Sequence, residues 1–254
     1  MQKNTISVLV LLILAHFSFS QKSDSSKRTT HFSGSISVTN TGLSLVPTFS
    51  LGKPAALVNL SIGGKKFSFE PDMRFALEGR PWSFLFWTRY KLLKTEKFAI
   101  TVGTHPALNF KTFTSVDGTV TTVVRRFLAG ELSPNYFFTR NISIGAYYLY
   151  AYGFDRGIHG TPKNNHFVTI NSNFSNIKLP YKFYMKFTPQ FYYLKQDQRD
   201  GYYFTSAFNL ARKNFPLSVS SVINKPIETN IIGGQDFVWN ISLIYSFKKN
   251  YVEK

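Results

Sequence analysis

The sequence predicts an all-β fold: a transmembrane antiparallel up-and-down β-barrel of about 12 strands (roughly 10 to 14). Three observations predict it. Apolar and polar residues alternate with period 2 along most of the chain, and beyond residue 20 no apolar run approaches the ~20 residues of a spanning helix. The chain has 26 Phe, 14 Tyr and 3 Trp, while only 17% of its residues are charged, against about 25% in globular proteins. A soluble protein must bury so many rings, whereas a membrane barrel can turn them toward lipid.

The chain begins with the layout of a secretory signal peptide. Lys3 precedes an apolar run at 6–14, and Ser18 and Ser20 occupy the −3 and −1 positions of a cleavage site before Gln21. The chain has no cysteine, which excludes disulfides and lipid attachment through a thiol. The expected organisation is a signal peptide, a flexible periplasmic lead, an outer-membrane barrel and a short periplasmic tail. These segments are 1–20, 21–31, 32–247 and 248–254.

Two stretches show the alternation most clearly. In 66–78, aromatic and other apolar residues occupy the odd positions and mostly charged residues the even ones, and in 181–194 aromatic residues again dominate the odd positions. Both stretches are longer than the ~5–6 residues common in soluble sheets, and they suffice for the ~9–11 residues of a tilted transmembrane strand. A soluble sandwich with one solvated face is the less favoured alternative.

The same pattern predicts twelve strands in order along the chain. They are 43–51, 55–62, 66–78, 82–92, 97–106, 119–137, 141–154, 166–175, 181–194, 202–211, 215–223 and 237–247. Two places leave the count open. Residues 31–42 could form a separate strand ended by an Asn-Thr-Gly turn, and 119–137 could break at Ala129-Gly130. Accepting both changes gives a fourteen-stranded barrel.

The connections between these strands differ in length. One end of the barrel would carry short turns, at 63–65, 93–97, 138–141, 175–181 and 211–214. The other end would carry mostly longer, more polar loops, at 107–118, 155–165, 195–201 and 224–236. Short periplasmic turns opposite longer outer loops are typical of transmembrane barrels.

The segment 237–247, FVWNISLIYSF, has one apolar face that ends in an aromatic residue. On this segment, and on the pattern of the whole mature chain, the sequence resembles the outer-membrane β-barrel proteins of Gram-negative bacteria. The resemblance implies that the last strand is the signal read by the barrel assembly machinery. The residues that would form this signal are Trp239, Ile241, Leu243, Tyr245 and Phe247. The chain departs from the simplest form of the signal, because seven residues follow Phe247.

The polar faces of the strands supply candidates for the wall of a pore. The candidates for lumen and selectivity residues are Glu70, Asp72, Arg74, Glu78, Arg89, Lys91, Lys182, Lys186 and Gln190. Aromatic residues near strand ends are expected to form the interfacial girdles. These are Trp82, Trp87, Tyr90, Tyr202 and Trp239.

The formal net charge of +17 is large, yet the basic residues are scattered and no nucleic-acid-binding motif is present. The expected partners are membrane lipid, lipopolysaccharide and anionic solutes, with no nucleic acid, and the oligomeric state is left open. The function predicted is a passive channel or transporter for small solutes, anionic ones included. A plugged structural barrel, or an accessory subunit of an envelope complex, is the alternative.

Catalytic and metal-binding patterns are weak, so no enzyme activity, cofactor or metal is expected. A lipid-modifying hydrolase would need a Ser-His pair on one strand face. His31 with Ser33, and His166 with Ser172, are the pairs that leave this alternative open.

Overall fold

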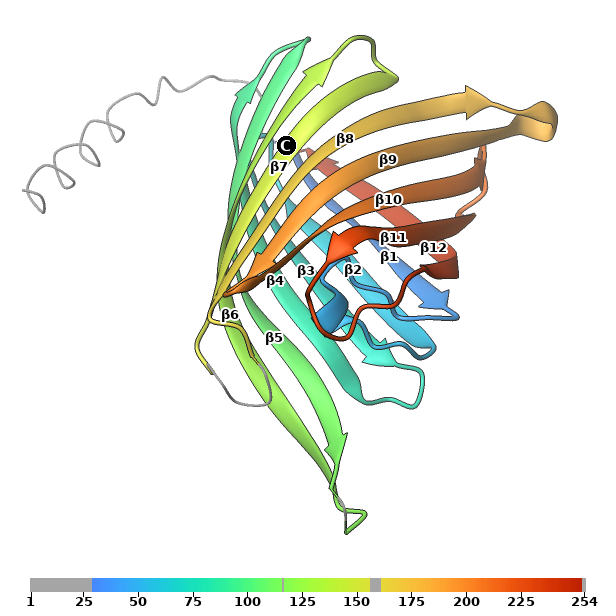
Figure 1. The fold of residues 1–254 in the computed structure, drawn as a ribbon. Coiled ribbons are helices and arrows are strands. Elements are labelled where there is room, and N and C mark those ends of the chain that lie inside the picture. Colours follow the sequence, from blue (N-terminus) through green and yellow to red (C-terminus); the bar gives the residue numbers. More distant parts are fainter. Residues whose placement is uncertain (1–28, 116, 156–160, 253–254) are drawn as a thin grey trace, which may run out of the picture.

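The computed structural model describes residues 29–115, 117–155 and 161–252. These residues form twelve antiparallel strands closed into one barrel, in which every strand pairs with its neighbours in the chain and β1 pairs with β12 (Figure 1). The strands are β1 Thr29–Thr39, β2 Ala55–Gly63, β3 Phe67–Ala76, β4 Pro81–Lys94, β5 Phe98–Thr114, β6 Val120–Phe137, β7 Ile142–Gly153, β8 Asn164–Lys178, β9 Phe183–Gln196, β10 Arg199–Arg212, β11 Leu217–Thr229 and β12 Val238–Val252. The expected up-and-down barrel is therefore confirmed.

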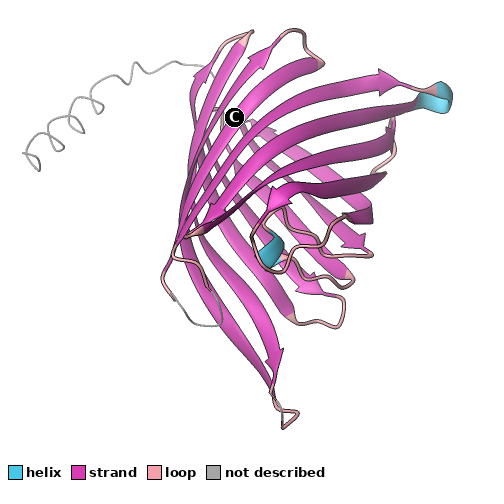
Figure 2. Cartoon of the chain, in the orientation of Figure 1, coloured by secondary structure: helices cyan, strands magenta, loops and turns pink. Residues whose placement is uncertain are grey.

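Two short 3-10 turns, η2 Pro47–Phe49 and η4 Pro180–Lys182, interrupt this all-strand architecture (Figure 2). No helix among the described residues is long and apolar enough to cross a membrane.

The prediction of a strand at 43–51 is wrong. The structure instead has a strand, β1, in the region of the alternative considered at 31–42. Residues 43–51 belong to the connection between β1 and β2. Pro47 has no amide hydrogen for a strand ladder and begins the η2 turn instead. The strand count remains twelve because β1 replaces this segment. The break considered at Ala129-Gly130 is absent, since β6 runs through both residues.

The ends of the barrel also differ from the predicted bounds. β1 begins at Thr29, inside the expected lead 21–31, and pairs with β12 as far as Val252, inside the expected tail 248–254. The ladder between the first and last strands closes the barrel, so neither strand can stop before its partner without leaving an open edge. The signal peptide 1–20 and most of the lead lie outside the described residues.

The hairpin of β5 and β6 extends well beyond its neighbours (Figure 1). β4 pairs with β5 only as far as Asn109, and β7 pairs with β6 only from Phe127. Residues 110–115 and 117–124 therefore project from the end of the barrel that carries the longer connections, which is the opposite end from both described termini.

Alternation places apolar side chains on the outside of the barrel wall. Outward positions of successive strands carry large exposed apolar residues, such as Ile36, Val38, Ile144, Ile170 and Leu243. The positions between them carry small polar residues that are buried inside the barrel. An apolar exterior around a polar interior is the arrangement of a barrel that lies in lipid.

The first prediction tests this assignment of the two faces. Ile170, 60% exposed near the middle of β8, is expected to lose about 2–4 kcal/mol of folding free energy when changed to Arg, because the charge enters the membrane interior. Asn171→Arg, the next position on β8, points into the lumen and should cost much less. Urea titration of both variants in lipid vesicles, with the folded fraction read from gel migration, measures the difference. Equal costs would mean that the faces are wrongly assigned.

Candidate functional site

The lumen face of three strands carries most of the predicted pore residues. Glu70, Asp72 and Arg74 occupy the inward positions of β3. Arg89 and Lys91 lie on the inward face of β4, where Lys91 pairs with Thr101 of β5. Lys186 and Gln190 share the inward face of β9, and Gln190 lines the central cavity of the barrel.

Two predicted pore residues do not lie on a strand face. Glu78 lies in the turn between β3 and β4, exposed, with Arg80 Nε 3.5 Å from its carboxylate. Lys182 ends the η4 turn with a positive φ of 65°, and β9 begins one residue later, at Phe183. The alternation in the sequence continues past the ends of the strands. It therefore predicted, wrongly, that both turn residues lie on the barrel wall.

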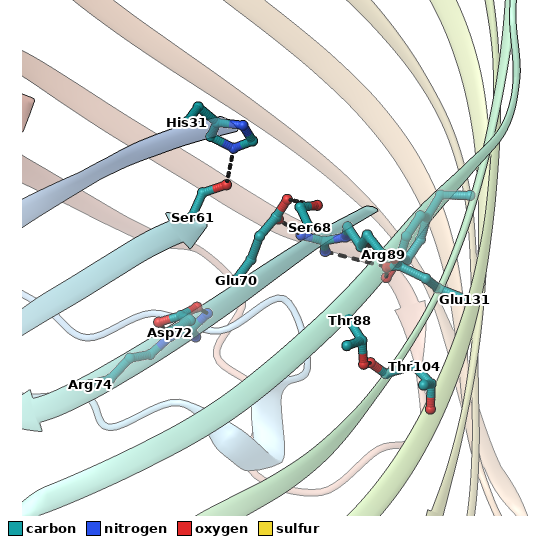
Figure 3. A network of polar contacts seen from close by, with 11 residues as sticks. His31, Ser61, Ser68, Glu70, Asp72, Arg74, Thr88, Arg89, Thr104 and Glu131 are labelled. Carbon is teal, nitrogen blue, oxygen red and sulfur yellow. Dashed lines mark hydrogen bonds and ion pairs between the residues drawn. The ribbon is translucent and has the colours of Figure 1, made fainter. Parts of the chain in front are cut away.

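Arg89 is the centre of an ion-pair network on the lumen wall (Figure 3). Its guanidinium binds Glu70 on the neighbouring strand β3, and its Nε lies 2.6 Å from Glu131 Oε1 on β6. Ser68 donates a hydrogen bond to Glu70, and the Tyr147 hydroxyl donates one to Glu131 over 2.7 Å. The network ties four strands, β3, β4, β6 and β7, into one rigid part of the wall.

A glycine makes the reach from Arg89 to Glu131 possible. β5 lies between the two strands, and Gly103 is the residue in register with both Arg89 and Glu131. A Cβ at Gly103 would stand 2.6 Å from Glu131 Oε1. The ion pair therefore crosses the β5 backbone at a position where only glycine leaves room for it.

A second ion pair lies on β3, next to Glu70 of the network. Arg74 binds Asp72 through two nitrogens, at 3.0 Å from Nε to Oδ1 and 2.6 Å from Nη2 to Oδ2. Each of the three acidic residues on the lumen face of the described strands is therefore paired with an arginine. Lys91 and Lys186 belong to none of the ion pairs found among the described residues.

Two tryptophans expected in the interfacial girdles face the lumen instead. Trp82 is buried, and its indole Nε1 donates to the carbonyl of Phe49 over 2.7 Å. Trp87 packs against His105, with ring centroids 3.6 Å apart, and Arg89 lies over the Trp87 ring. Trp87 alternates in step with Arg89 and Lys91, which were expected in the lumen, so the alternation already indicated its face and the girdle assignment was wrong. Trp82 lies beside a register shift between β3 and β4, where alternation does not fix the face. Tyr90, Tyr202 and Trp239 are exposed.

The connection from β1 to β2 folds into the barrel rather than away from it. This lumen loop, residues 40–54 with the η2 turn, lies across the open end of the barrel beside the β11–β12 connection (Figure 1). Three distant strands donate hydrogen bonds to its carbonyl groups. Trp82 of β4 binds Phe49, Arg125 of β6 binds Thr48 at 3.1 Å, and the Tyr192 hydroxyl of β9 binds Leu45 at 2.9 Å.

Side chains of the lumen loop complete its attachment. The Thr48 hydroxyl and the Gln196 amide hydrogen-bond across the barrel, and the Phe49 ring packs on Phe127 with centroids 5.0 Å apart. Leu45 and Val46 pack against a buried cluster that includes Phe167 and Tyr192. Because polar and apolar contacts both hold it, the loop is an ordered partition of the lumen.

The partition separates cavities of different character. A cavity of about 460 Å³ lies in the middle of the barrel, with lumen-loop residues such as Leu45 and Phe49 forming part of its wall. A second cavity, of about 360 Å³, lies toward the long-loop end between the lumen loop, Arg80, Lys111 and Arg125. A solute that crossed the barrel would have to pass the lumen loop between them.

Sequence reasoning missed four residues of this site. Glu131, Arg125, His105 and Phe49 all face the lumen or cross it. Glu131 and Arg125 alternate with apolar residues in 119–137, which was a signal for the inward face of that strand. His105 and Phe49 carry no such signal, since their placement depends on the strand register and on the inward fold of the loop.

The pairs considered for a hydrolase are not assembled. His31 Nε2 lies 3.0 Å from Ser61 Oγ on β2 rather than binding Ser33. His166 binds the Tyr148 hydroxyl at 2.9 Å on the outer face. The described residues contain no group of three or more metal-ligating side chains close enough to hold an ion.

The predicted assembly-signal residues lie together on the outer face of β12. Trp239, Ile241, Leu243 and Tyr245 are about half exposed, and Phe247 packs on Phe32 of β1 with centroids 5.6 Å apart. The strand continues with the same alternation to Tyr251, which also faces outward. Recognition of this face by an assembly machinery stays a prediction.

No protein-family model matches the sequence, and no curated protein matches it. Among solved structures the chain is similar to the KdgM porin, at 11% identity and a TM-score of 0.50, over 85% of this chain and 99% of that one. It is also similar to the NanC porin (12%, TM-score 0.49, 87% and 100%) and to OmpT of Vibrio cholerae (9%, TM-score 0.39, 89% and 99%). At 11% identity the likeness to the KdgM porin shows the fold alone, a closed β-barrel.

Proposed function

We propose that the protein is a passive outer-membrane channel for small solutes that favours anions. The observation that carries the proposal is the pairing of charges on the lumen wall. Glu70 and Glu131 share Arg89 and Asp72 pairs with Arg74, whereas Lys91, Arg125 and Lys186 have no acidic partner among the described residues, so the cations on this face outnumber the acids. Uncompensated positive side chains in a low-dielectric pore attract anions and repel cations.

The proposed location follows from the outer face. A band of exposed apolar and aromatic side chains surrounds the wall, which is stable against lipid and unstable in water. We propose export through the N-terminal signal segment, insertion by the barrel assembly machinery through the β12 face, and contact of the barrel with membrane lipid and lipopolysaccharide. Recovery of the protein in the outer-membrane fraction, with gel migration that changes on heating, would support this.

Reversal potentials in a salt gradient test the selectivity. Wild-type protein in planar bilayers is expected to pass anions preferentially, and the double change Lys91→Glu with Lys186→Glu should invert the sign of the reversal potential. Lys195→Glu with Lys225→Glu makes the same change of charge at positions that alternation places on the outer face of β9 and β11, so it should leave the sign unchanged. A wild type that prefers cations would refute the proposed selectivity.

A plugged structural barrel is the second candidate function. The lumen loop favours it, because hydrogen bonds from β4, β6 and β9 hold that loop inside the barrel, where it lines both the central and the outer cavity. A barrel with this function would pass no ions at all, which separates it from the channel.

A further inference from the structure

We propose that the middle of the barrel is a binding chamber for a small solute that consists of an aromatic ring and one uncharged hydrogen-bonding group. The inference rests on the proposed channel function and names a solute that the lumen would bind, as distinct from the small ions that would pass through it. The chamber is the cavity of about 460 Å³ beside the lumen loop. This volume lies in the range of about 300–1,000 Å³ that ligand pockets occupy.

The walls of the chamber are unusually apolar for the inside of a transmembrane barrel, where polar side chains are the rule. Leu85, Leu149 and Val222 project inward from β4, β7 and β11, and the lumen loop adds Leu45 and Phe49. A sugar bound here would exchange most of its hydrogen bonds to water for contacts with apolar walls. An apolar solute would gain by leaving water.

Aromatic rings give the apolar walls a specific shape. Phe49 and Phe127 meet at an interplanar angle of 57°, and Tyr147 and Phe167 meet at 72° with centroids 6.1 Å apart. All four rings line the chamber. Aromatic rings prefer such tilted and edge-to-face contacts. An aromatic ring of the solute could therefore pack against these four rings with the same geometry.

His105 and Gln190 offer polar groups to the chamber that have no hydrogen-bond partner among the described residues. His105 is 4% exposed and its Nδ1 is buried without a partner among the described residues. Gln190 lines the chamber from β9, and its side-chain amide takes part in none of the hydrogen bonds found in the described chain. A buried polar atom without a partner is costly, and one polar group on the solute would satisfy it.

The charges near the chamber argue for an uncharged polar group. Arg74 is the one ionised side chain in the lining, and Asp72 already binds it through two nitrogens. A carboxylate on the solute would therefore enter the chamber without a free counter-charge and would lose its hydration. Benzyl alcohol represents the proposed class, benzoate the same ring with a charge, and glucose a purely polar solute.

Calorimetric titration of the protein in lipid nanodiscs tests the chamber. Ala107 lines it from β5, so Ala107→Phe fills part of its volume. Ala99→Phe is the matched control, because Ala99 lies on the same face of β5 near the opposite end. Wild type and Ala99→Phe should bind benzyl alcohol saturably, and Ala107→Phe should bind it roughly tenfold more weakly or worse. Gel migration confirms that each variant is folded.

Other outcomes overturn the inference. Non-saturable binding of benzyl alcohol would overturn it, and so would an affinity for benzyl alcohol in Ala107→Phe equal to that of wild type. Binding of benzoate as tight as that of benzyl alcohol, or binding of glucose but not of benzyl alcohol, would also overturn it. The titration does not need ion flow. Conductance without saturable binding would therefore refute the chamber alone, and saturable binding without conductance would refute the channel alone.

Discussion

Replacing Arg89 with Met is expected to destabilise the barrel by about 3–5 kcal/mol, the usual cost of removing one partner from a buried ion pair. The Glu131 side chain is 2% exposed, and Arg89 is the residue that neutralises it. Without Arg89, the carboxylate stays buried beside the Gly103 backbone and keeps only the hydrogen bond from Tyr147. The free energy of unfolding from urea titrations in lipid vesicles measures the loss.

Two further variants separate this cause from general damage. Adding Glu131→Gln to Arg89→Met removes the unpaired charge and should recover most of the lost stability. Arg126→Met breaks the pair with Asp155, in which the Arg126 side chain is 63% exposed, and should change the stability little, because solvent screens an exposed pair. A loss below about 1 kcal/mol for Arg89→Met would show that water in the lumen solvates Glu131 and that the network is not structural.

Replacing residues 43–51 of the lumen loop with a short Gly-Ser linker is expected to raise single-channel conductance several-fold. The replacement removes the backbone carbonyls that accept from Trp82, Arg125 and Tyr192, together with the Phe49 ring. The loop lines both the central and the outer cavity, so its removal should widen the passage between them. Conductance in planar bilayers measures the change.

Thr48→Ala is the control for the loop. It removes the hydroxyl that binds Gln196 but keeps the three carbonyl contacts, so its conductance should equal that of wild type. If wild type is silent and the shortened variant conducts, the protein is a plugged barrel. If both conduct equally, the lumen loop does not obstruct the path.

The alternation of the sequence predicted most of the wall because each strand lies between lipid and lumen. Ile170 and Asn171, or Phe69 and Glu70, differ in polarity for that reason. The alternation continues along whole strands, from the 11 residues of β1 to the 18 residues of β6. The same rule failed at 43–51, where alternation also occurs. There the apolar residues Leu45 and Val46 are buried by the inside of the barrel rather than by lipid.

The ion-pair network could not be read from the sequence. Arg89 and Glu131 are 42 positions apart, and they meet only because the register places Gly103 between them. No local pattern fixes a register that depends on every hairpin of the wall. Trp82 was misplaced for a related reason: it lies beside a register shift between β3 and β4, which alternation in the sequence does not reveal.

Thiol modification of a single cysteine in the lumen tests the central claim, a solute path through the middle of the barrel, most directly. The chain has no native cysteine, so Gln190→Cys places the one reactive thiol in the central chamber, and Phe191→Cys places it next along β9 on the outer face, where Phe191 is 60% exposed. A charged methanethiosulfonate is applied while single-channel current is recorded. The account predicts that the current through Gln190→Cys falls irreversibly and that the current through Phe191→Cys does not change. Conducting channels that lose no current in Gln190→Cys would contradict it, since ions would then cross without passing the chamber.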